Sequence, residues 1–154
     1  MSGKIDLIRN TDDESIADMD MGLLISSAFY SFTQHMNDYF DEIGLSLTQA
    51  RVLFTLGIQD NVSIDYIADK TYTNKSIVTN SVKVLEKKDL VKKEIDSSDN
   101  RKKIITITNK GIQVRDKSQE ISIKIEEEMM DKFGSEELAS FKKYLKKFIL
   151  ILND

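Results

Sequence analysis

Apolar residues recur at intervals of three and four over much of this chain, a spacing typical of amphipathic helices. The first such stretch covers residues 15–43 and predicts one long helix that ends at Gly44. Three shorter helices are predicted to follow, each with a buried stripe: Val52, Leu53 and Leu56, then Ile64, Ile67 and Ala68, then Val78, Val82 and Leu85. Thr48, Ser63 and Thr73 stand where N-caps of these helices are expected.

The apolar spacing changes to two after residue 90. Val91, Lys93 and Ile95 alternate with other residues, and Ile105 and Ile107 do the same after a polar turn at residues 96–101. Two alternating runs joined by such a turn predict an antiparallel β-hairpin. Asp89, just before the hairpin, is expected to adopt the left-handed conformation that ends the preceding helix.

Two further helices are predicted at the C-terminal end, the first capped by Thr108 and running to about Lys132, the second following Gly134-Ser135 and ending near Leu152. Their apolar positions are Ile112, Ile121, Ile125, Met129, Phe133, Leu138, Phe141, Leu145, Phe148, Ile149 and Leu152. A small lobe cannot cover this surface and the first helix as well, so the excess predicts a helical dimer interface. The alternative is that the three long helices cover one another within a monomer.

This order of elements predicts a mainly α fold with a minor β part, namely a winged helix-turn-helix with long N- and C-terminal dimerisation helices. At 154 residues we expect one domain over residues 1–154. Within it, residues 46–108 are expected to form the winged helix-turn-helix lobe, and residues 15–44 and 109–152 the helical dimerisation region.

Composition excludes several classes of site. The chain has no cysteine, which rules out disulfides, thiol catalysis and cysteine-based zinc sites. It has a single histidine, His35, so we expect no metal site, and the alternative is a weak site of carboxylates. No Gly-rich phosphate loop or paired nucleophile and base is recognisable, so we expect neither an enzyme nor a cofactor. Residues 1–20 do not resemble a secretion signal and residues 21–37 are too polar to span a membrane, which predicts a cytoplasmic protein without a membrane partner.

Charge is distributed unevenly along the chain. The net charge is −4, but residues 61–118 contain 13 Lys and Arg against 8 Asp and Glu, an excess of five positive charges. The remainder contains 9 basic against 18 acidic residues, an excess of nine negative charges. Because screening limits phosphate attraction to about 8 Å at physiological salt, the local excess matters more than the total. A basic middle between acidic ends is compatible with binding to double-stranded DNA.

The helix predicted near residues 73–87 has residue types that read DNA on the face opposite its apolar stripe. Lysine donates to guanine, asparagine pairs with adenine, and serine or threonine donates to phosphate. The candidate DNA contacts are Thr73, Asn74, Lys75, Ser76, Thr79, Asn80 and Lys83. Taken alone, such a face is also typical of an ordinary solvated helix.

The predicted hairpin adds a second basic element beside that helix. Its turn has Asp99, Arg101, Lys102 and Lys103, and Lys92 and Lys93 lie on the partner strand. A narrow, positively charged loop suits the adjacent minor groove, whose negative potential attracts an inserted arginine. Asp99 is placed to hold the Arg101 guanidinium or to fix the turn.

With these elements the sequence resembles the MarR family (multiple antibiotic resistance regulators) of winged helix-turn-helix transcription factors. The resemblance rests on residues 47–53, on residues 64–90 with Ile67-Ala68, on Asp99-Asn100-Arg101 and on Ile107-Thr108-Asn109-Lys110-Gly111. It implies groove contacts at Ser76, Thr79 and Asn80 and a wing-tip contact at Arg101. Asn80 and Asn100 replace arginines of the family pattern and Asp89 replaces a glycine, which predicts weaker, less salt-dependent binding unless Lys75, Lys83 and Lys102 compensate.

The resemblance further implies a homodimeric regulator, a repressor that responds to a ligand and binds a pseudo-palindromic operator. A small aromatic effector would bind between the dimer helices and the DNA-binding lobe, and the candidate residues are Tyr30, Phe32, His35, Tyr39, Arg51, Tyr66 and Tyr72. The alternative for each of these is core packing with its polar tip satisfied. The alternative function is a protein-interaction module on the same fold, an antirepressor or scaffold that does not bind DNA.

Overall fold

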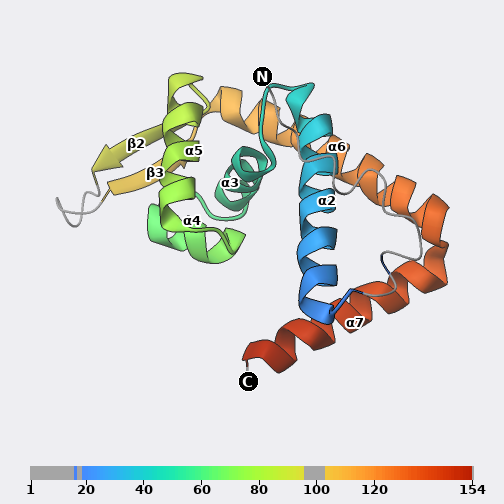
Figure 1. Ribbon diagram of the computed structural model, residues 1–154. Coiled ribbons are helices and arrows are strands. Elements are labelled where there is room, and N and C mark those ends of the chain that lie inside the picture. The colour runs from blue at the N-terminus through green and yellow to red at the C-terminus, as the bar shows by residue number, and fades with distance from the viewer. Residues whose placement is uncertain (1–15, 17–18, 96–102, 154) are drawn as a thin grey trace, which may run out of the picture.

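The computed structural model describes residues 16, 19–95 and 103–153 (Figure 1). A lobe of short helices and strands lies on one side of a long helix, and two further long helices form a V, the first extending away from the lobe and the second turning back. The elements are α2 (Met21–Asp41), α3 (Leu47–Ile58), β1 (Val62–Ser63), α4 (Ile64–Thr71), α5 (Lys75–Lys87), β2 (Val91–Ile95), β3 (Lys103–Ile107), α6 (Asn109–Phe133) and α7 (Ser135–Asn153). The mainly α winged-helix architecture expected from the sequence is confirmed.

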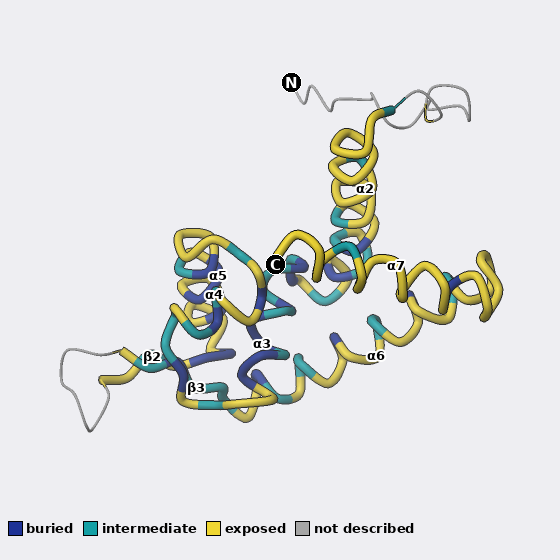
Figure 2. Tube along the Cα trace, turned by 90° about the horizontal axis from the view of Figure 1, so that it is seen from below, coloured by how far each residue is buried: buried dark blue, intermediate teal, exposed yellow. Residues whose placement is uncertain are grey.

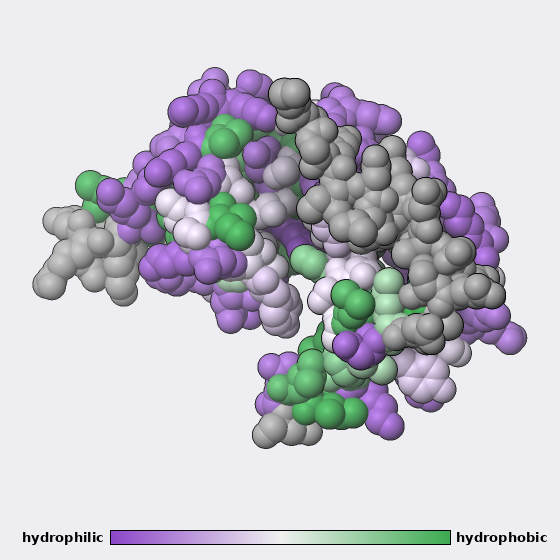
Figure 3. Space-filling view, in the orientation of Figure 1, coloured by the Kyte–Doolittle hydropathy of each residue, from purple (hydrophilic) through white to green (hydrophobic). Residues whose placement is uncertain are grey.

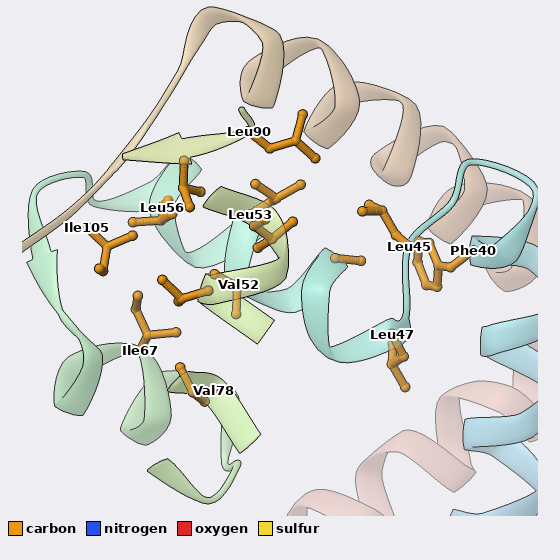
Figure 4. Packing of buried hydrophobic residues seen from close by; sticks show 14 of the residues in the cluster. Phe40, Leu45, Leu47, Val52, Leu53, Leu56, Ile67, Val78, Leu90 and Ile105 are labelled. Carbon is orange, nitrogen blue, oxygen red and sulfur yellow. The ribbon is translucent and has the colours of Figure 1, made fainter. Parts of the chain in front are cut away.

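The core of the lobe forms around α3. Leu53 and Leu56 on α3 are buried against side chains from the other elements of the lobe (Figure 4). The apolar stripes predicted for α4 and α5 face this core, with Ile67 and Val78 fully buried. Ile105 on β3 closes it from the sheet side. Burial of this kind contributes roughly 1.5–3 kcal/mol for each large aliphatic side chain, which is why short helices of weak propensity are stable here.

The hairpin is confirmed, and a third strand joins it. In β2 and β3, Val91 pairs with Ile107 and Lys93 with Ile105. The two-residue strand β1 pairs with β3 on its other side, so the sheet order is β1-β3-β2. Asp60, in the polar turn before β1, accepts a hydrogen bond from the backbone N–H of Ile107 at 2.9 Å. That turn is therefore attached to the sheet rather than free in solvent.

The first long helix begins later than its apolar pattern predicts. It starts at Met21 rather than at residue 15, because the Asp20 carboxylate accepts a hydrogen bond from the Leu23 N–H at 2.9 Å and caps it. Its predicted end is confirmed, since Gly44 has φ 69° and the Leu45 N–H donates to the Phe40 carbonyl at 3.0 Å. This is the bond pattern of a glycine-ended helix.

Two of the predicted N-caps are wrong by one or two residues. Ser46 rather than Thr48 caps α3, and it does so in a capping box with Gln49. Asn74 rather than Thr73 caps α5. Ser63 and Thr108 cap α4 and α6 as predicted, and Asp89 has the expected left-handed backbone at φ 58°.

The start of α6 passes very close to the end of α5. The Thr108 hydroxyl donates to the Asp89 carbonyl at 2.7 Å, and the Thr108 N–H donates to the Leu90 carbonyl at 3.1 Å. Gly111 lies so close to this point that a Cβ atom on it would be 2.0 Å from the Leu90 oxygen. Only glycine allows this approach, which fixes the direction in which α6 leaves the lobe.

The long helices stay largely exposed in the single chain (Figure 2). Tyr39 on α2 donates a hydrogen bond of 2.5 Å to Glu128 on α6, which joins these two helices. On α7 the described residues include one buried side chain, Leu138, while Phe141 and Ile149 are 49% and 52% exposed. The predicted alternative, in which the long helices cover one another within a monomer, is therefore not what the single chain adopts. No helix in the described part of the chain is long and apolar enough to cross a membrane.

Candidate nucleic-acid interface

Helix α5 presents its polar face outward, as the sequence predicts. Val78, Val82 and Leu85 are buried in the lobe. On the other side the candidate contacts that lie exposed are Asn74, Lys75, Ser76, Asn80 and Lys83, while Thr73 and Thr79 are half-buried. The polar groups of the first two turns of α5 are thus brought together on the outside of the lobe, beside the sheet (Figure 1).

Several of these polar groups are already bonded to one another. The Asn74 side-chain oxygen accepts from both the N–H and the hydroxyl of Ser76, at 2.9 and 2.8 Å. The Thr79 hydroxyl donates to the Lys75 carbonyl at 2.7 Å. A hydroxyl has one proton to donate, so Ser76 and Thr79 must give up these bonds before they can donate to a phosphate. Among the described residues, Asn80 and Lys83 have no side-chain hydrogen-bond or ion-pair partner, which makes their donors available at once.

Lys75 is also engaged. Its ammonium lies 2.6 Å from the carboxylate of Asp65, which belongs to the first turn of α4. Both side chains are well exposed, at 63% and 70%. This pair cannot be predicted from the spacing of the two residues, because they are brought together by the angle between α4 and α5.

The strands place a second basic group beside α5. Lys92 and Lys93 lie on β2, and Lys103 is the first residue of β3, paired with Ile95. Asp99, Arg101 and Lys102, predicted at the wing tip, lie outside the described residues. The described ends of the hairpin nevertheless point away from the helical core, with Ile95 and Lys103 exposed (Figure 1).

An open cavity of about 700 Å³ lies between α2, α3 and the corner that joins α4 to α5. Its lining is mixed, with apolar side chains and several hydroxyls: Phe29, Thr33, Leu47, Thr48, Arg51, Phe54, Thr55, Ile58, Lys70, Thr71, Tyr72, Thr73, Asn74 and Ile77. The start of α5 is therefore part of the cavity wall. A volume of this size matches a small organic molecule.

The predicted ligand residues divide into two groups. Arg51 and Tyr72 line the cavity, whereas Tyr30, Phe32, His35, Tyr39 and Tyr66 are not among its lining residues. Tyr66 donates to the side chain of Gln59 at 2.8 Å, which gives it a structural role. His35 packs edge-on against Tyr39, with ring centroids 5.1 Å apart. The hydroxyls of Tyr66 and Tyr39 are thus satisfied, the latter by Glu128, whereas His35 is exposed and is not part of the core.

Sequence reasoning missed the apolar side of the cavity. Phe29, Phe54, Ile58 and Ile77 line it, and of these Ile58 is 87% exposed. The available signal was that Ile58 and Ile77 fall outside the buried stripes of their helices. An apolar residue off the stripe of a short helix is the kind of residue that lines a surface pocket.

The polar side of the cavity contains one partly desolvated cation. Burial lowers the pKa of the Arg51 guanidinium, and its side chain has no hydrogen bond or ion pair with any described residue. Nearby, the Thr33 hydroxyl oxygen is buried and has no hydrogen-bond partner within the described ranges. An anion with a hydrogen-bonding group would satisfy both, because an unpaired buried polar group costs free energy.

In the described part of the chain, no group of three or more His, Asp or Glu side chains is arranged to hold a metal ion.

Comparison with known proteins agrees with this geometry. The MarR family model matches residues 45–103, which include α3, α4, α5 and β2. A curated relative, the HTH-type transcriptional regulator MhqR of Bacillus subtilis (strain 168), is 31% identical over 90 residues. The matched stretch is 58% of this chain and spans 62% of the length of that relative.

Solved structures with the same fold cover more than four fifths of the chain. A structure concerning regulation of DNA binding of Bordetella bronchiseptica BpsR by 6-hydroxynicotinic acid matches with a TM-score of 0.76 at 19% identity, over 84% of this chain and 92% of that one. The S. aureus MepR–DNA complex matches with a TM-score of 0.72 at 22% identity, over 86% and 96% of the two chains. Residues 45–103 are therefore a MarR-family domain, and the chain has the fold of that family's winged-helix regulators.

Proposed function

We propose that this protein is a sequence-specific DNA-binding transcriptional regulator that acts as a repressor. The observation that supports this most directly is the exposed polar face of α5, which lies next to a basic hairpin within a MarR-family domain. In a helix-turn-helix the second helix enters the major groove. Asn80 and Lys83 would then read base edges, and Arg101 at the wing tip would enter the minor groove. We propose no catalytic activity.

The proposed regulator is a homodimer. Exposed apolar side chains gather on α7, as the C-terminal part of that helix shows in Figure 3, and others lie on the N-terminal half of α2. They include Met21, Leu23, Phe29, Phe141, Leu145, Ile149 and Leu152. A patch of this kind on long helices suits a twofold interface between two copies. The two α5 helices would then enter successive major grooves about one turn, ~10 bp, apart on a pseudo-palindromic operator.

Sequencing the duplexes selected by the purified protein from a random pool tests this proposal. We expect an enriched site with twofold symmetry and half-sites about 10 bp apart. Binding to that site should weaken by about 1–3 kcal/mol in the variant Arg101→Ala. Asn80→Ala should change the preferred base pairs. The matched control is Lys132→Ala, which removes a cation near the end of α6, away from the lobe.

Two outcomes of that experiment would contradict the proposal. The proposed dimer would be contradicted by a selected pool without symmetry. A sedimentation coefficient that corresponds to a single chain at micromolar concentration would contradict it as well. Absence of duplex binding, or binding that does not change with salt, would favour a protein-interaction module on the same fold, because phosphate contacts release counterions and make affinity salt-dependent.

Regulation by a small molecule is the second part of the proposal. The cavity is proposed to take a small aromatic acid, with its carboxylate at Arg51 and its ring among Phe29, Phe54 and Tyr72. Because Thr73, Asn74 and Ile77 form part of the wall, an occupant would contact the start of the DNA-reading helix. A ligand changes DNA affinity only if it binds the two states of the protein unequally, and shared contacts of this kind provide that difference.

The effector proposal can be tested with 6-hydroxynicotinic acid and its uncharged carboxamide as probes in calorimetry. We expect the acid to bind and the amide to bind at least about tenfold more weakly, because it lacks the charge that pairs with Arg51. Arg51→Gln should remove the difference between the two probes. Tyr66→Phe, which changes an aromatic residue outside the cavity, is the control. Equal affinity of Arg51→Gln and the unaltered protein for the acid would show that Arg51 is not the anchor.

A further inference from the structure

The ion pair between Lys75 and Asp65 lies on the face proposed to contact DNA. Lys75 is the first residue of α5, and the distance between its ammonium and the Asp65 carboxylate is 2.6 Å. Of the cations predicted to contact DNA from α5, Lys75 is thus bonded to an acid while Lys83 has no such partner among the described residues. A lysine that is paired in this way is not free to neutralise a phosphate.

Helix electrostatics explain why the pair forms. The first turn of a helix has a partial positive charge, which disfavours a cation there and favours an anion. Lys75 is a cation at the start of α5, whose first turn has no acidic residue of its own. Asp65 is an anion in the first turn of α4, where the helix favours it. The Asp65 carboxylate is therefore favoured at the start of α4 and also offsets the unfavourable position of the Lys75 ammonium at the start of α5.

We propose that Asp65 attenuates DNA binding by holding Lys75 in an ion pair that the duplex must break. The inference rests on the proposed DNA-binding function. In a helix-turn-helix the first helix crosses the DNA backbone, so the start of α4 and its carboxylate would lie near phosphates. Asp65 thus competes with a phosphate for Lys75 and also repels it. Both effects act on the backbone, so they lower affinity for every sequence alike.

The test compares Asp65→Asn with Asp69→Asn in titrations of the full chain with its selected operator and with a random duplex. Asp69 is the matched control, because it is an exposed acid on the same helix and lies 3.5 Å from Lys70, which belongs to the cavity wall rather than to the face of α5. Asp65→Asn should tighten binding to both duplexes by roughly two- to fivefold, the range typical of a single exposed ion pair. Asp69→Asn should change binding less.

The salt dependence separates this mechanism from a change in overall charge or fold. When Lys75 is released to a phosphate, the slope of log affinity against log salt should become steeper by about one unit. In the variant Lys75→Gln, adding Asp65→Asn should give a smaller gain than it gives in the unaltered chain. Circular dichroism of each variant should be unchanged.

The outcomes distinguish this inference from the proposed function. If the unaltered protein binds DNA with a measurable salt slope but Asp65→Asn and Asp69→Asn behave alike, the inference is wrong and the proposed function stands. If Asp65→Asn gains the same factor with and without Lys75, the carboxylate acts without the pair and the inference is again wrong. If none of these proteins binds any duplex at low salt, both are overturned.

Discussion

Replacing Gly111 by alanine sets two physical effects against each other at the junction between the lobe and α6. Gly111 is the third residue of α6, and alanine is favoured over glycine in a helix by roughly 1 kcal/mol. A Cβ atom at this position, however, would lie 2.0 Å from the Leu90 carbonyl oxygen and 2.8 Å from a side-chain carbon of Ile107. Propensity therefore predicts a more stable protein, and packing predicts a less stable one.

Packing should win, because the atom in the way cannot move easily. The Leu90 carbonyl accepts the N–H of Thr108 at 3.1 Å, and Leu90 itself is buried. Inserting a carbon into a packed site costs about 1–3 kcal/mol, and we expect the upper end where the neighbour is backbone. After subtraction of the gain of roughly 1 kcal/mol from helix propensity, the free energy of unfolding should fall by about 2 kcal/mol. For a chain of this size, that loss corresponds to a decrease of about 4–8 °C in Tm.

Urea unfolding followed by circular dichroism measures this difference. The protein concentration must be the same for each variant, because the apparent stability of the proposed dimer would depend on it. Gln113→Ala is the control, since it changes an exposed residue two positions further along α6 and should leave the free energy of unfolding within about 0.5 kcal/mol. A Gly111→Ala protein that is as stable as the unaltered one, or more stable, would refute the close approach of α6 to Leu90.

Three further predictions concern stability. Ser46→Ala removes the capping box of α3 and should lower the free energy of unfolding by about 1 kcal/mol, whereas Thr48→Ala, at the position that does not cap, should cost less; equal losses would contradict the cap. Phe40→Ala should cost about 3–5 kcal/mol in the same assay because Phe40 is fully buried, and a loss below 1 kcal/mol would show that it is not in the core. The hydrogen bond to Glu128 raises the pKa of Tyr39, so the bond's contribution to the free energy of unfolding is complete below about pH 10 and is lost as the pH rises through the raised pKa. The urea midpoint should therefore fall more steeply from pH 8 to pH 11 in the unaltered protein than in Tyr39→Phe, and parallel curves would argue against the bond.

The features that the sequence predicted correctly are those with a repeating pattern or a special backbone position. The apolar stripes of α4 and α5 recur over several turns, and the change to a spacing of two marks β2 and β3. Gly44 and Asp89 are predictable because a helix commonly ends at a left-handed residue, and both have positive φ. A pattern that recurs over several turns still identifies its helix or strand when the role of one residue in it is ambiguous.

The features that it missed depend on single residues or on tertiary geometry. Strand β1 has two residues, too few to show an alternation, and it forms because Ile104 and Ile105 offer a free strand edge. The caps of α3 and α5 were misplaced because serine, threonine and asparagine stand within two positions of each other and all can cap. The sequence also cannot separate an apolar side chain that faces a cavity, such as Phe54, from one that faces the core.

Asn74 belongs both to the N-terminal cap of α5 and to the wall of the cavity. Its side chain begins α5, and the same residue forms part of the cavity wall. A substitution that adapts the wall to a different proposed effector would also disturb the first turn of the helix that we propose faces DNA. In related proteins we therefore expect the choice of inducer and the choice of binding site to diverge together, rather than as two independently evolving traits.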